Sequence, residues 1–228
     1  MKGYEENELC YTLKDQIRLE GDLENAKQRL ALKHDFNLFD AFRIFEKYSS
    51  GYITKYDLED GLAKLGIYGP RQEINLFMKR YDTNQDGRLR FSEFADALTP
   101  KDRVYANMLN ERRSNYNVRN PEDAFSYLTK LDFTDLLKKM LRIEGQSEDI
   151  RKSVNRRPLF RISDAFEALD ENKNGYLSKQ EFGSLLEEHR LYASQKDLDL
   201  LFSKYDRDRD GRVSYSEFFN EILPKEGY

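Results

Sequence analysis

An internal repeat constrains the fold of this chain more than any other feature of its sequence. Shifting the 228-residue sequence by 124 positions aligns residues 17–100 with residues 141–224 without a gap, and 23 of the 84 aligned pairs are identical. Chance similarity does not hold an ungapped register over such a length. The sequence therefore predicts two copies of one unit, joined by a 40-residue connector, residues 101–140.

Apolar residues recur at helical spacing within each copy. Phe36, Phe39, Phe42 and Phe45, for example, stand three residues apart. Four glycines fall in short polar breaks between such stretches: Gly51, Gly87, Gly175 and Gly211. The pattern predicts an all-α fold made of four helix–loop–helix units, two in each copy. The regularly spaced Phe and Leu side chains are expected to form its core.

Three of the four polar breaks follow the pattern Asp-x-[Asp/Asn]-x-[Asp/Asn]-Gly-x5-Glu. They are the second loop (residues 82–93), the third loop (170–181) and the fourth loop (206–217). Calcium is a hard cation that binds about six to eight oxygen atoms. Loop positions one, three, five and twelve supply side-chain oxygens, and position seven supplies a backbone carbonyl. Glycine at position six permits the sharp turn that brings these oxygens together.

These loops and their flanking helices resemble the EF-hand superfamily, which includes calmodulin, troponin C and centrin, over about residues 36–100 and 160–224. The resemblance implies Ca²⁺ as the bound ion and a ligand set carried over position by position. The implied ligands are Asp82, Asn84, Asp86, Arg88 (backbone carbonyl) and Glu93 in the second loop; Asp170, Asn172, Asn174, Tyr176 (backbone carbonyl) and Glu181 in the third; and Asp206, Asp208, Asp210, Arg212 (backbone carbonyl) and Glu217 in the fourth. It also implies short antiparallel bridges that pair Ile53 with Leu89 and Leu177 with Val213.

The number of carboxylates in each loop predicts the order of calcium affinities. The fourth loop, with four, is expected to bind most tightly. The third loop has only Asp170 and Glu181 and is expected to bind more weakly. In the second loop Arg90 occupies position nine, where it either occludes a coordinating water or projects outward. About three Ca²⁺ ions are predicted, with Mg²⁺ as an alternative at the weaker loops.

The first loop, residues 46–57, departs from the calcium-binding pattern. Tyr48 at position three is too bulky to replace Asp or Asn as a ligand, and Asp57 at position twelve is one methylene shorter than the usual Glu. We expect a metal-free loop that pairs with its neighbour. The alternative is a weak site or a site for magnesium, which is satisfied by one or two carboxylates and retained waters.

Four segments are predicted along the chain. They are an N-terminal amphipathic helix within residues 1–35, a first EF-hand pair (36–100), a basic, partly helical connector (101–159) and a second EF-hand pair (160–228). The N-terminal helix has three possible roles: covering the apolar face of a pair, occupying the groove that a target would use, or docking onto an external partner. Residues 101–157 hold 13 Lys/Arg and 9 Asp/Glu, a net charge of +4, and a solvated connector with partial helix is expected. Within it, the apolar residues between Leu131 and Leu141 predict one further packed helix, so a plain flexible linker is not expected.

Several classes of function are not expected. His34 and His189 have no pattern that would join them to Cys10 as a nucleophile or a zinc site, and no glycine-rich phosphate loop is present, so no enzyme is predicted. The formal charge of −4 does not suggest nucleic acid as a partner. No apolar run approaches the roughly 18 residues of a membrane-spanning helix. The single cysteine and the lack of a signal-peptide pattern at the first residues predict a cytoplasmic location.

The preferred functional interpretation is a structural or adaptor component of a cytoskeletal assembly that calcium tunes. A second resemblance, carried by residues 35–42 and 98–109, is to the double-pair EF-hand proteins of cilia and flagella, some of which lie on axonemal microtubules. The expected partner is a helical segment or an acidic filament such as a microtubule, because three calcium ions would change the formal charge from −4 to −4 + 6 = +2. The alternatives are a calmodulin-like sensor that exposes a groove, and a passive calcium buffer.

Overall fold

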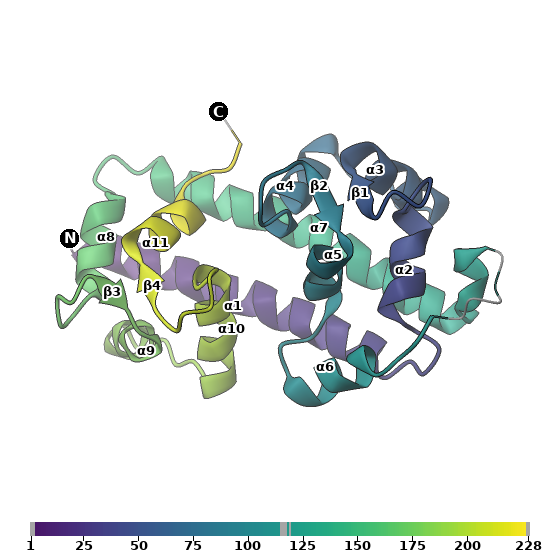
Figure 1. Ribbon diagram of the computed structural model, residues 1–228. Helices are drawn as coiled ribbons and strands as arrows, with labels where there is room; N and C mark the ends of the chain where they lie inside the picture. Colours follow the sequence, from purple (N-terminus) through teal and green to yellow (C-terminus); the bar gives the residue numbers. More distant parts are fainter. Residues whose placement is uncertain (1–2, 115–117, 119, 227–228) are drawn as a thin grey trace. The chain divides into compact units, whose positions relative to one another are not determined.

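The computed structural model describes residues 3–114, 118 and 120–226. The chain forms two compact units. Unit 1 contains Met1–Asp22 and Gln146–Tyr228, and unit 2 contains Leu23–Gly145. Each unit holds one predicted pair of helix–loop–helix elements together with parts of two long helices (Figure 1).

The first pair lies in unit 2. Its elements are α2 (Leu38–Phe45), β1 (Tyr52–Thr54), α3 (Lys55–Lys64), α4 (Arg71–Tyr81), β2 (Arg88–Arg90) and α5 (Phe91–Leu98). Strands β1 and β2 are antiparallel, with Ile53 opposite Leu89, and both side chains are fully buried. The bridge predicted between the first and second loops is therefore confirmed.

The second pair lies in unit 1 and repeats this order. Its elements are α8 (Ile162–Leu169), β3 (Tyr176–Leu177), α9 (Lys179–Glu188), α10 (Gln195–Tyr205), β4 (Val213–Ser214) and α11 (Tyr215–Ile222). Leu177 lies opposite Val213 in the antiparallel bridge, as predicted. The fold is all-α with two short strand pairs, which confirms the predicted class.

Three of the helices that leave a loop begin with a capping box, in which two side chains satisfy backbone N–H groups reciprocally. In α11 the Ser214 hydroxyl accepts a hydrogen bond from Glu217 N, while the Glu217 carboxylate accepts one from Ser214 N. The same arrangement begins α3 with Thr54 and Asp57 and α9 with Ser178 and Glu181. Position twelve of these loops is thus also the third residue of the outgoing helix.

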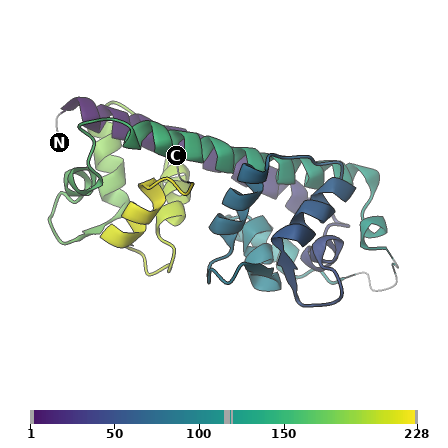
Figure 2. The ribbon, with the colours of Figure 1, turned by 90° about the horizontal axis from the view of Figure 1, so that it is seen from above.

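Two long helices and two short ones flank the pairs. They are α1 (Gly3–Ala31), α6 (Arg103–Asn110), the 3₁₀ turn η1 (Pro121–Ala124) and α7 (Tyr127–Asn155). Both long helices are divided between the units: residues up to 22 of α1 and from 146 of α7 belong to unit 1, and the remainder belongs to unit 2. In each unit, segments of both helices lie along one side of the helix–loop–helix pair (Figure 2).

The division exchanges equivalent helix segments between the repeat copies. Residues 9–20 of α1 correspond to residues 133–144 of α7 under the 124-residue shift, with Leu9, Leu13 and Ile17 matching Phe133, Leu137 and Leu141. The α1 segment lies in unit 1 with the second pair, and the α7 segment lies in unit 2 with the first pair. Each pair is thus completed by the long-helix segment that precedes the other pair in the sequence.

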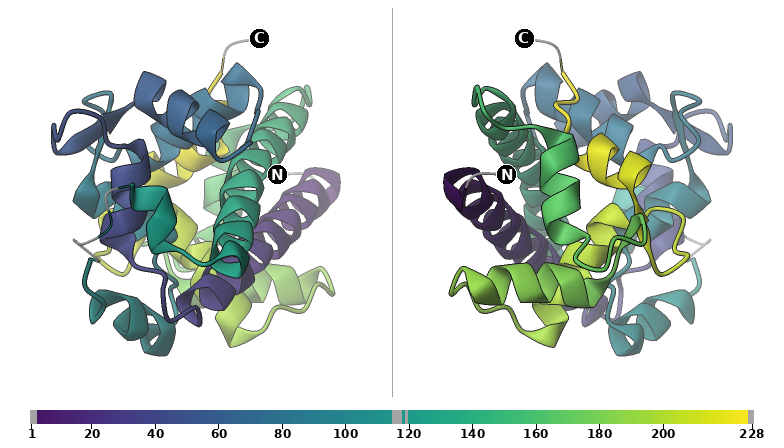
Figure 3. Two further views of the ribbon diagram at one scale, coloured as in Figure 1. Left: turned by 90° about the vertical axis from the view of Figure 1, so that its right-hand side faces the viewer. Right: turned by 90° about the vertical axis from the view of Figure 1, so that its left-hand side faces the viewer.

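In unit 1, the α1 segment is part of the hydrophobic core. Leu9, Cys10 and Leu13 are fully buried, and they form one cluster with apolar side chains of α8, α9, α10 and α11. Figure 3 (right) shows the ribbon with α8 and α9 toward the viewer. Burial raises the pKa of the Cys10 thiol to about 12, with smaller contributions from Glu6 and Glu188. The predicted amphipathic helix therefore covers the apolar face of the second pair from within the same chain.

In unit 2, the α7 segment has the same role for the first pair. The Phe133 ring is fully buried, and its centroid lies 5.4 Å from that of Phe36, 6.3 Å from that of Phe45 and 6.1 Å from that of Phe125. Leu136, Leu137, Met140 and Leu141 are also buried. The packed helix predicted for this part of the connector is therefore present, and its apolar residues fall on one helix face.

Antiparallel contacts join α1 to α7 within unit 2. Arg29 Nη2 lies 3.1 Å from Asp135 Oδ2, and Lys33 Nζ lies 3.0 Å from Asp132 Oδ2. The Arg112 guanidinium, beyond α6, donates to the backbone carbonyls of Ala31, Lys33 and Phe36, at the end of α1 and just after it.

Among the described helices, none is long and apolar enough to cross a membrane.

Two helical glycines provide a test of this packing. A Cβ atom added at Gly61 of α3 would overlap the Phe45 ring, whereas a Cβ added at Gly21 of α1 would meet no atom within 4 Å. We expect Gly61→Ala to lower the free energy of unfolding by about 1–3 kcal/mol, because overpacking outweighs helix propensity. The matched control, Gly21→Ala, should raise it by roughly 0.5–1 kcal/mol. Urea denaturation measures both; equal effects would contradict the packing described for α2 and α3.

Candidate metal centres

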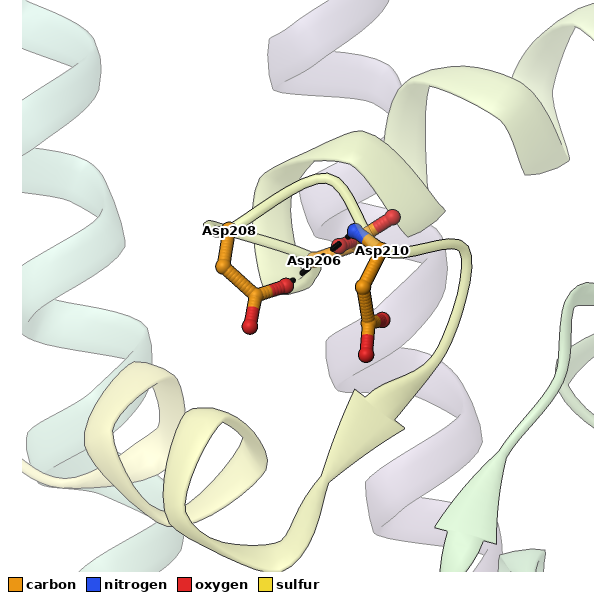
Figure 4. A group of neighbouring side chains, drawn as sticks. All are labelled: Asp206, Asp208 and Asp210. Atoms are coloured by element: carbon orange, nitrogen blue, oxygen red, sulfur yellow. Dashed lines mark hydrogen bonds between the residues drawn. The ribbon is translucent and has the colours of Figure 1, made fainter.

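The fourth loop brings three carboxylates together. Asp206, Asp208 and Asp210 each offer one carboxylate oxygen, and these oxygens all lie within 4.8 Å of one another (Figure 4). The Asp208 Oδ1 atom accepts a hydrogen bond from Asp210 N, and Asp210 Oδ1 accepts one from Arg212 N. These short-range bonds fold the loop inward and hold the carboxylates at its centre.

Asp206 is the residue of this loop whose environment fits a cation best. It is the C-cap of α10, and its Oδ2 atom accepts a hydrogen bond of 3.2 Å from Gly211 N. Its Oδ1 atom is buried and has no hydrogen-bond partner among the described residues. Burial raises the pKa of Asp206, against the hydrogen bond from Gly211, and the charges of Glu217 and Asp210 raise it further. A cation would supply the partner and the charge that this oxygen lacks.

The same backbone turn forms all three matching loops. Position four has a positive φ of 60° at Gln85, 56° at Lys173 and 62° at Arg209. The glycine at position six has a φ of 79° in the second loop, 83° in the third and 85° in the fourth. A β-branched or bulky residue would be strained at position six, so Gly is the residue that this turn requires.

The third loop has this geometry with two amides in place of carboxylates. Asp170 Oδ1 and Asn172 Oδ1 both accept hydrogen bonds of 3.0 Å from Asn174 N, and Asp170 Oδ2 accepts one from Gly175 N. The Asn172 amide donates to Glu181 Oε1 at 3.0 Å. The Tyr176 N–H, at position seven, donates to Asn174 Oδ1 at 2.8 Å. These hydrogen bonds connect the four residues whose side chains are implied as ligands of this loop.

In the second loop Arg90 is drawn toward the loop. Its Nη2 atom lies 2.9 Å from Asp86 Oδ2, and this hydrogen bond lowers the pKa of Asp86. Asp86 Oδ1 accepts from Arg88 N, while Asp82 accepts from Gly87 N at 2.7 Å. The sequence left open whether Arg90 occludes a coordinating water or projects outward; the structure shows a third arrangement, in which Arg90 pairs with the ligand carboxylate of Asp86.

The glutamates at position twelve reach back to the start of their loops. Glu93 Oε1 accepts hydrogen bonds from the backbone N–H and hydroxyl of Thr83, and Glu217 Oε1 accepts one from Arg207 N. Burial raises the pKa of Glu93, but hydrogen bonds from Arg90 N and Thr83 outweigh it and hold the pKa below its ordinary value. At Glu217, burial is likewise outweighed by hydrogen bonds from the Ser214 N–H and hydroxyl, which lower the pKa of this carboxyl. Both shifts favour the ionised carboxylate, the state that a calcium ligand requires.

The first loop has a different interior. Glu46 Oε1 accepts a hydrogen bond of 2.6 Å from Gly51 N, as the first-position Asp does elsewhere. The backbone has a positive φ at both Tyr48 and Ser49, and the Tyr48 side chain is 95% exposed. Asp57 is held by the Thr54 N–H and hydroxyl in the capping box. The side chain at position three, Tyr48, therefore presents no oxygen to the interior of this loop.

The ligand atoms that the second, third and fourth loops offer to a metal are all oxygens, which suits a hard divalent cation. The sequence profile of the EF-hand domain pair family matches residues 35–99 and 159–223, more than half of the chain. The chain belongs to this family.

Individual EF-hand relatives point to calcium. Calmodulin-like protein 2 of Arabidopsis thaliana is 25% identical over 179 residues, which cover 78% of this chain and 84% of that protein. Probable calcium-binding protein CML21 of the same plant is 28% identical over 181 residues, 78% of this chain and 62% of that protein. Calcium-dependent protein kinase 14 of Arabidopsis thaliana is 22% identical over 191 residues, but these cover only 26% of the kinase.

Sequence patterns did not reveal the ion pair of Arg90 with Asp86 or the buried charges beneath the fourth EF-hand loop. Arg90 stands four residues after Asp86, a spacing that suggests an ion pair only on a helix, and the chain is extended there. The buried charges come from helices that are distant in sequence, as in the pair of Glu20 with Lys204, which are 184 residues apart. A charged residue on the apolar side of a helix is the one signal that could have indicated them.

The Arg90 ion pair generates a prediction about affinity. In a chain carrying Glu181→Gln and Glu217→Gln, so that the second loop alone is intact, Arg90→Gln should raise calcium affinity by up to about fivefold, because Asp86 loses a competing cation. Arg88→Gln removes the same charge from the same loop but keeps the backbone N–H that bonds to Asp86, and it should have a smaller effect. Isothermal titration calorimetry measures both. Equal changes would mean that general charge, and not the ion pair, sets the affinity.

Proposed function

We propose that this protein binds about three calcium ions in its second, third and fourth loops and serves as a structural or adaptor component of a cytoskeletal assembly. The ligands in this proposal are the residues implied by the loop pattern, from Asp82 to Glu93, from Asp170 to Glu181 and from Asp206 to Glu217. The first loop is a metal-free partner of the second. The chain has no enzymatic role in this proposal.

The loops are proposed to differ in affinity. The fourth binds most tightly, since it has four carboxylates and the unpartnered buried oxygen of Asp206. The third has two carboxylates and binds less tightly. The second is weakened by Arg90, which holds Asp86. Magnesium, which prefers few carboxylates and retained waters, competes best at the third and second loops.

The observation that carries the structural role is the occupied apolar face of each EF-hand pair. In unit 1 that face is filled by Leu9, Leu13 and Ile17 of α1, and in unit 2 by Phe133 of α7 and its neighbours. A sensor of the calmodulin type needs such a face free for a target helix. Here the chain supplies the helices itself, which suits a stable component of an assembly.

The proposed partner is an acidic filament, with a microtubule as the specific candidate. Three bound calcium ions change the formal charge from −4 to −4 + 6 = +2, which favours an acidic surface in the calcium-loaded state. The resemblance of residues 35–42 and 98–109 to EF-hand proteins of cilia and flagella supports an axonemal microtubule. The corresponding location is the cytoplasm, at the cytoskeleton or the axoneme.

A calcium sensor is the second candidate function, and the calmodulin-like relatives favour it. It requires calcium to release α1 from unit 1, so that the core formed by Leu9 and Leu13 becomes accessible. A passive buffer, the third candidate, would bind calcium with neither release nor a partner.

Calcium stoichiometry tests the proposed sites. The unaltered protein should bind about three ions, and Glu93→Gln, Glu181→Gln and Glu217→Gln should each remove about one, because each takes away the closing carboxylate of a loop. Asp57→Asn is the matched control in the first loop and should leave the number unchanged. Equilibrium dialysis with metal analysis gives the counts. Loss of an ion in Asp57→Asn would contradict the metal-free first loop.

Filament binding tests the proposed role. The protein should co-sediment with microtubules more strongly in calcium than in chelator, and the Glu93→Gln/Glu181→Gln/Glu217→Gln variant should show no such difference. Binding of an apolar dye should not rise when calcium is added, because α1 and α7 stay in place. A large calcium-dependent rise in dye fluorescence without filament binding would favour the sensor instead.

A further inference from the structure

A buried cluster of five charged side chains lies beneath the fourth loop in unit 1. The Lys204 Nζ atom lies 2.8 Å from Glu20 Oε1 and 3.5 Å from Glu221 Oε1. Arg151 continues the network, with Nη1 3.3 Å from Glu221 Oε1 and Nε 2.9 Å from Glu148 Oε2. The exposed fractions of the Lys204 and Arg151 side chains are both 3%, so water screens these contacts weakly.

The cluster holds both ends of the fourth loop. Lys204 stands in the last turn of α10, two residues before the ligand Asp206. Glu221 stands in α11, one turn after the ligand Glu217. The pair of Lys204 with Glu221 thus joins the incoming helix to the outgoing helix just below the loop.

The same cluster ties the loop to the flanking helices. Glu20 belongs to α1, and Glu148 and Arg151 belong to α7. Next to Lys204, the buried Tyr205 hydroxyl donates a hydrogen bond of 2.7 Å to Gln16 Oε1, also in α1. The residue that precedes the first calcium ligand is therefore bonded to the helix that fills the apolar face of the pair.

The repeat supplies an internal comparison. Under the 124-residue shift Lys204 corresponds to Arg80 and Glu20 to Glu144, and this pair is kept in unit 2, with Arg80 Nη1 2.6 Å from Glu144 Oε1. Glu221, however, corresponds to Ala97. The acid that joins the incoming and outgoing helices is thus missing beneath the second loop. The counterparts of Glu148 and Arg151, which are Glu24 and Lys27, are also buried, so the acid at position 221 is the difference between the two clusters.

We propose that Glu20, Lys204 and Glu221 are positioning residues for calcium at the fourth loop, and that calcium binding and the docking of α1 strengthen each other through them. This inference rests on the proposed function, in which the fourth loop is a calcium site. The docked α1 fixes the end of α10, so the loop is preorganised before the ion arrives. By linkage, calcium then stabilises the docked helix by the same factor.

The experiment isolates the fourth loop in the full chain with Glu93→Gln and Glu181→Gln, and it compares two charge-neutralising changes in α1. Glu20→Gln weakens the contact with Lys204, whereas Asp22→Asn, the matched control, alters an exposed residue two positions away. Calorimetric titration should show calcium affinity about fivefold or more lower in Glu20→Gln, the lower end of typical coupling between two sites. Asp22→Asn should leave the affinity unchanged.

A second pair of variants separates positioning from general destabilisation. Lys204→Arg copies Arg80 of the other unit and should keep the calcium affinity, whereas Lys204→Met should lower it. Hydrogen exchange supplies the reciprocal readout: calcium should slow exchange at residues 9–20 of α1, and Glu20→Gln should reduce that slowing. If Glu20→Gln does not fold, this lysine pair decides the question.

The outcomes separate the two levels of the proposal. Equal affinities in Glu20→Gln, Asp22→Asn and the parent would overturn the coupling while leaving the fourth loop as a calcium site. No calcium binding in the parent itself would overturn the proposed site and the coupling with it. Faster exchange of residues 9–20 in calcium would reverse the sign of the linkage and contradict the inference.

Discussion

Burial of the α1 segment against the second EF-hand pair is the interaction on which unit 1 depends. Leu9, Leu13 and Ile17 enter a core that α8 to α11 leave incomplete. A fully buried side chain of this size stabilises the fold by roughly 1.5–3 kcal/mol. In unit 2 the equivalent α7 segment makes the equivalent contact through Phe133. The repeat therefore appears in the structure as an exchange of helices, and neither pair presents the open face of an isolated EF-hand pair.

Calcium chemistry and helix packing meet at the residues next to the loops. Asp206 is the C-cap of α10 and Glu217 lies in the first turn of α11, so any movement of these helices displaces the ligand positions. Lys204 and Tyr205 carry contacts from α10 to Glu20 and Gln16 in α1. The ligand positions of the fourth loop thus depend on whether α1 is docked. The second loop lacks an acid equivalent to Glu221, because Ala97 occupies that position. Differences between the loops therefore arise both within the twelve residues that define them and in the helices next to them.

Sequence spacing predicted the elements that depend on local chemistry. The positive-φ glycines and the loop patterns follow from positions within one repeat, so they could be recognised without a structure. The bridge between Ile53 and Leu89 was implied by the resemblance to EF-hand pairs. The exchange of α1 and α7 could not be predicted, because Leu13 and Leu137 have the same helical pattern and neither shows which pair it covers. The Lys204–Glu20 contact was missed for the same reason, since it joins residues 184 positions apart.

The reactivity of Cys10 tests the central claim, that α1 remains in the core of unit 1 when calcium binds. Cys10 is the single cysteine of the chain, it is fully buried beside Leu9, and burial raises its pKa to about 12. A thiol in that environment reacts slowly with a maleimide because little thiolate is present or accessible. If α1 stays docked, maleimide labelling of Cys10 is slow in chelator and equally slow or slower in calcium. Rapid labelling of Cys10 on addition of calcium would contradict it.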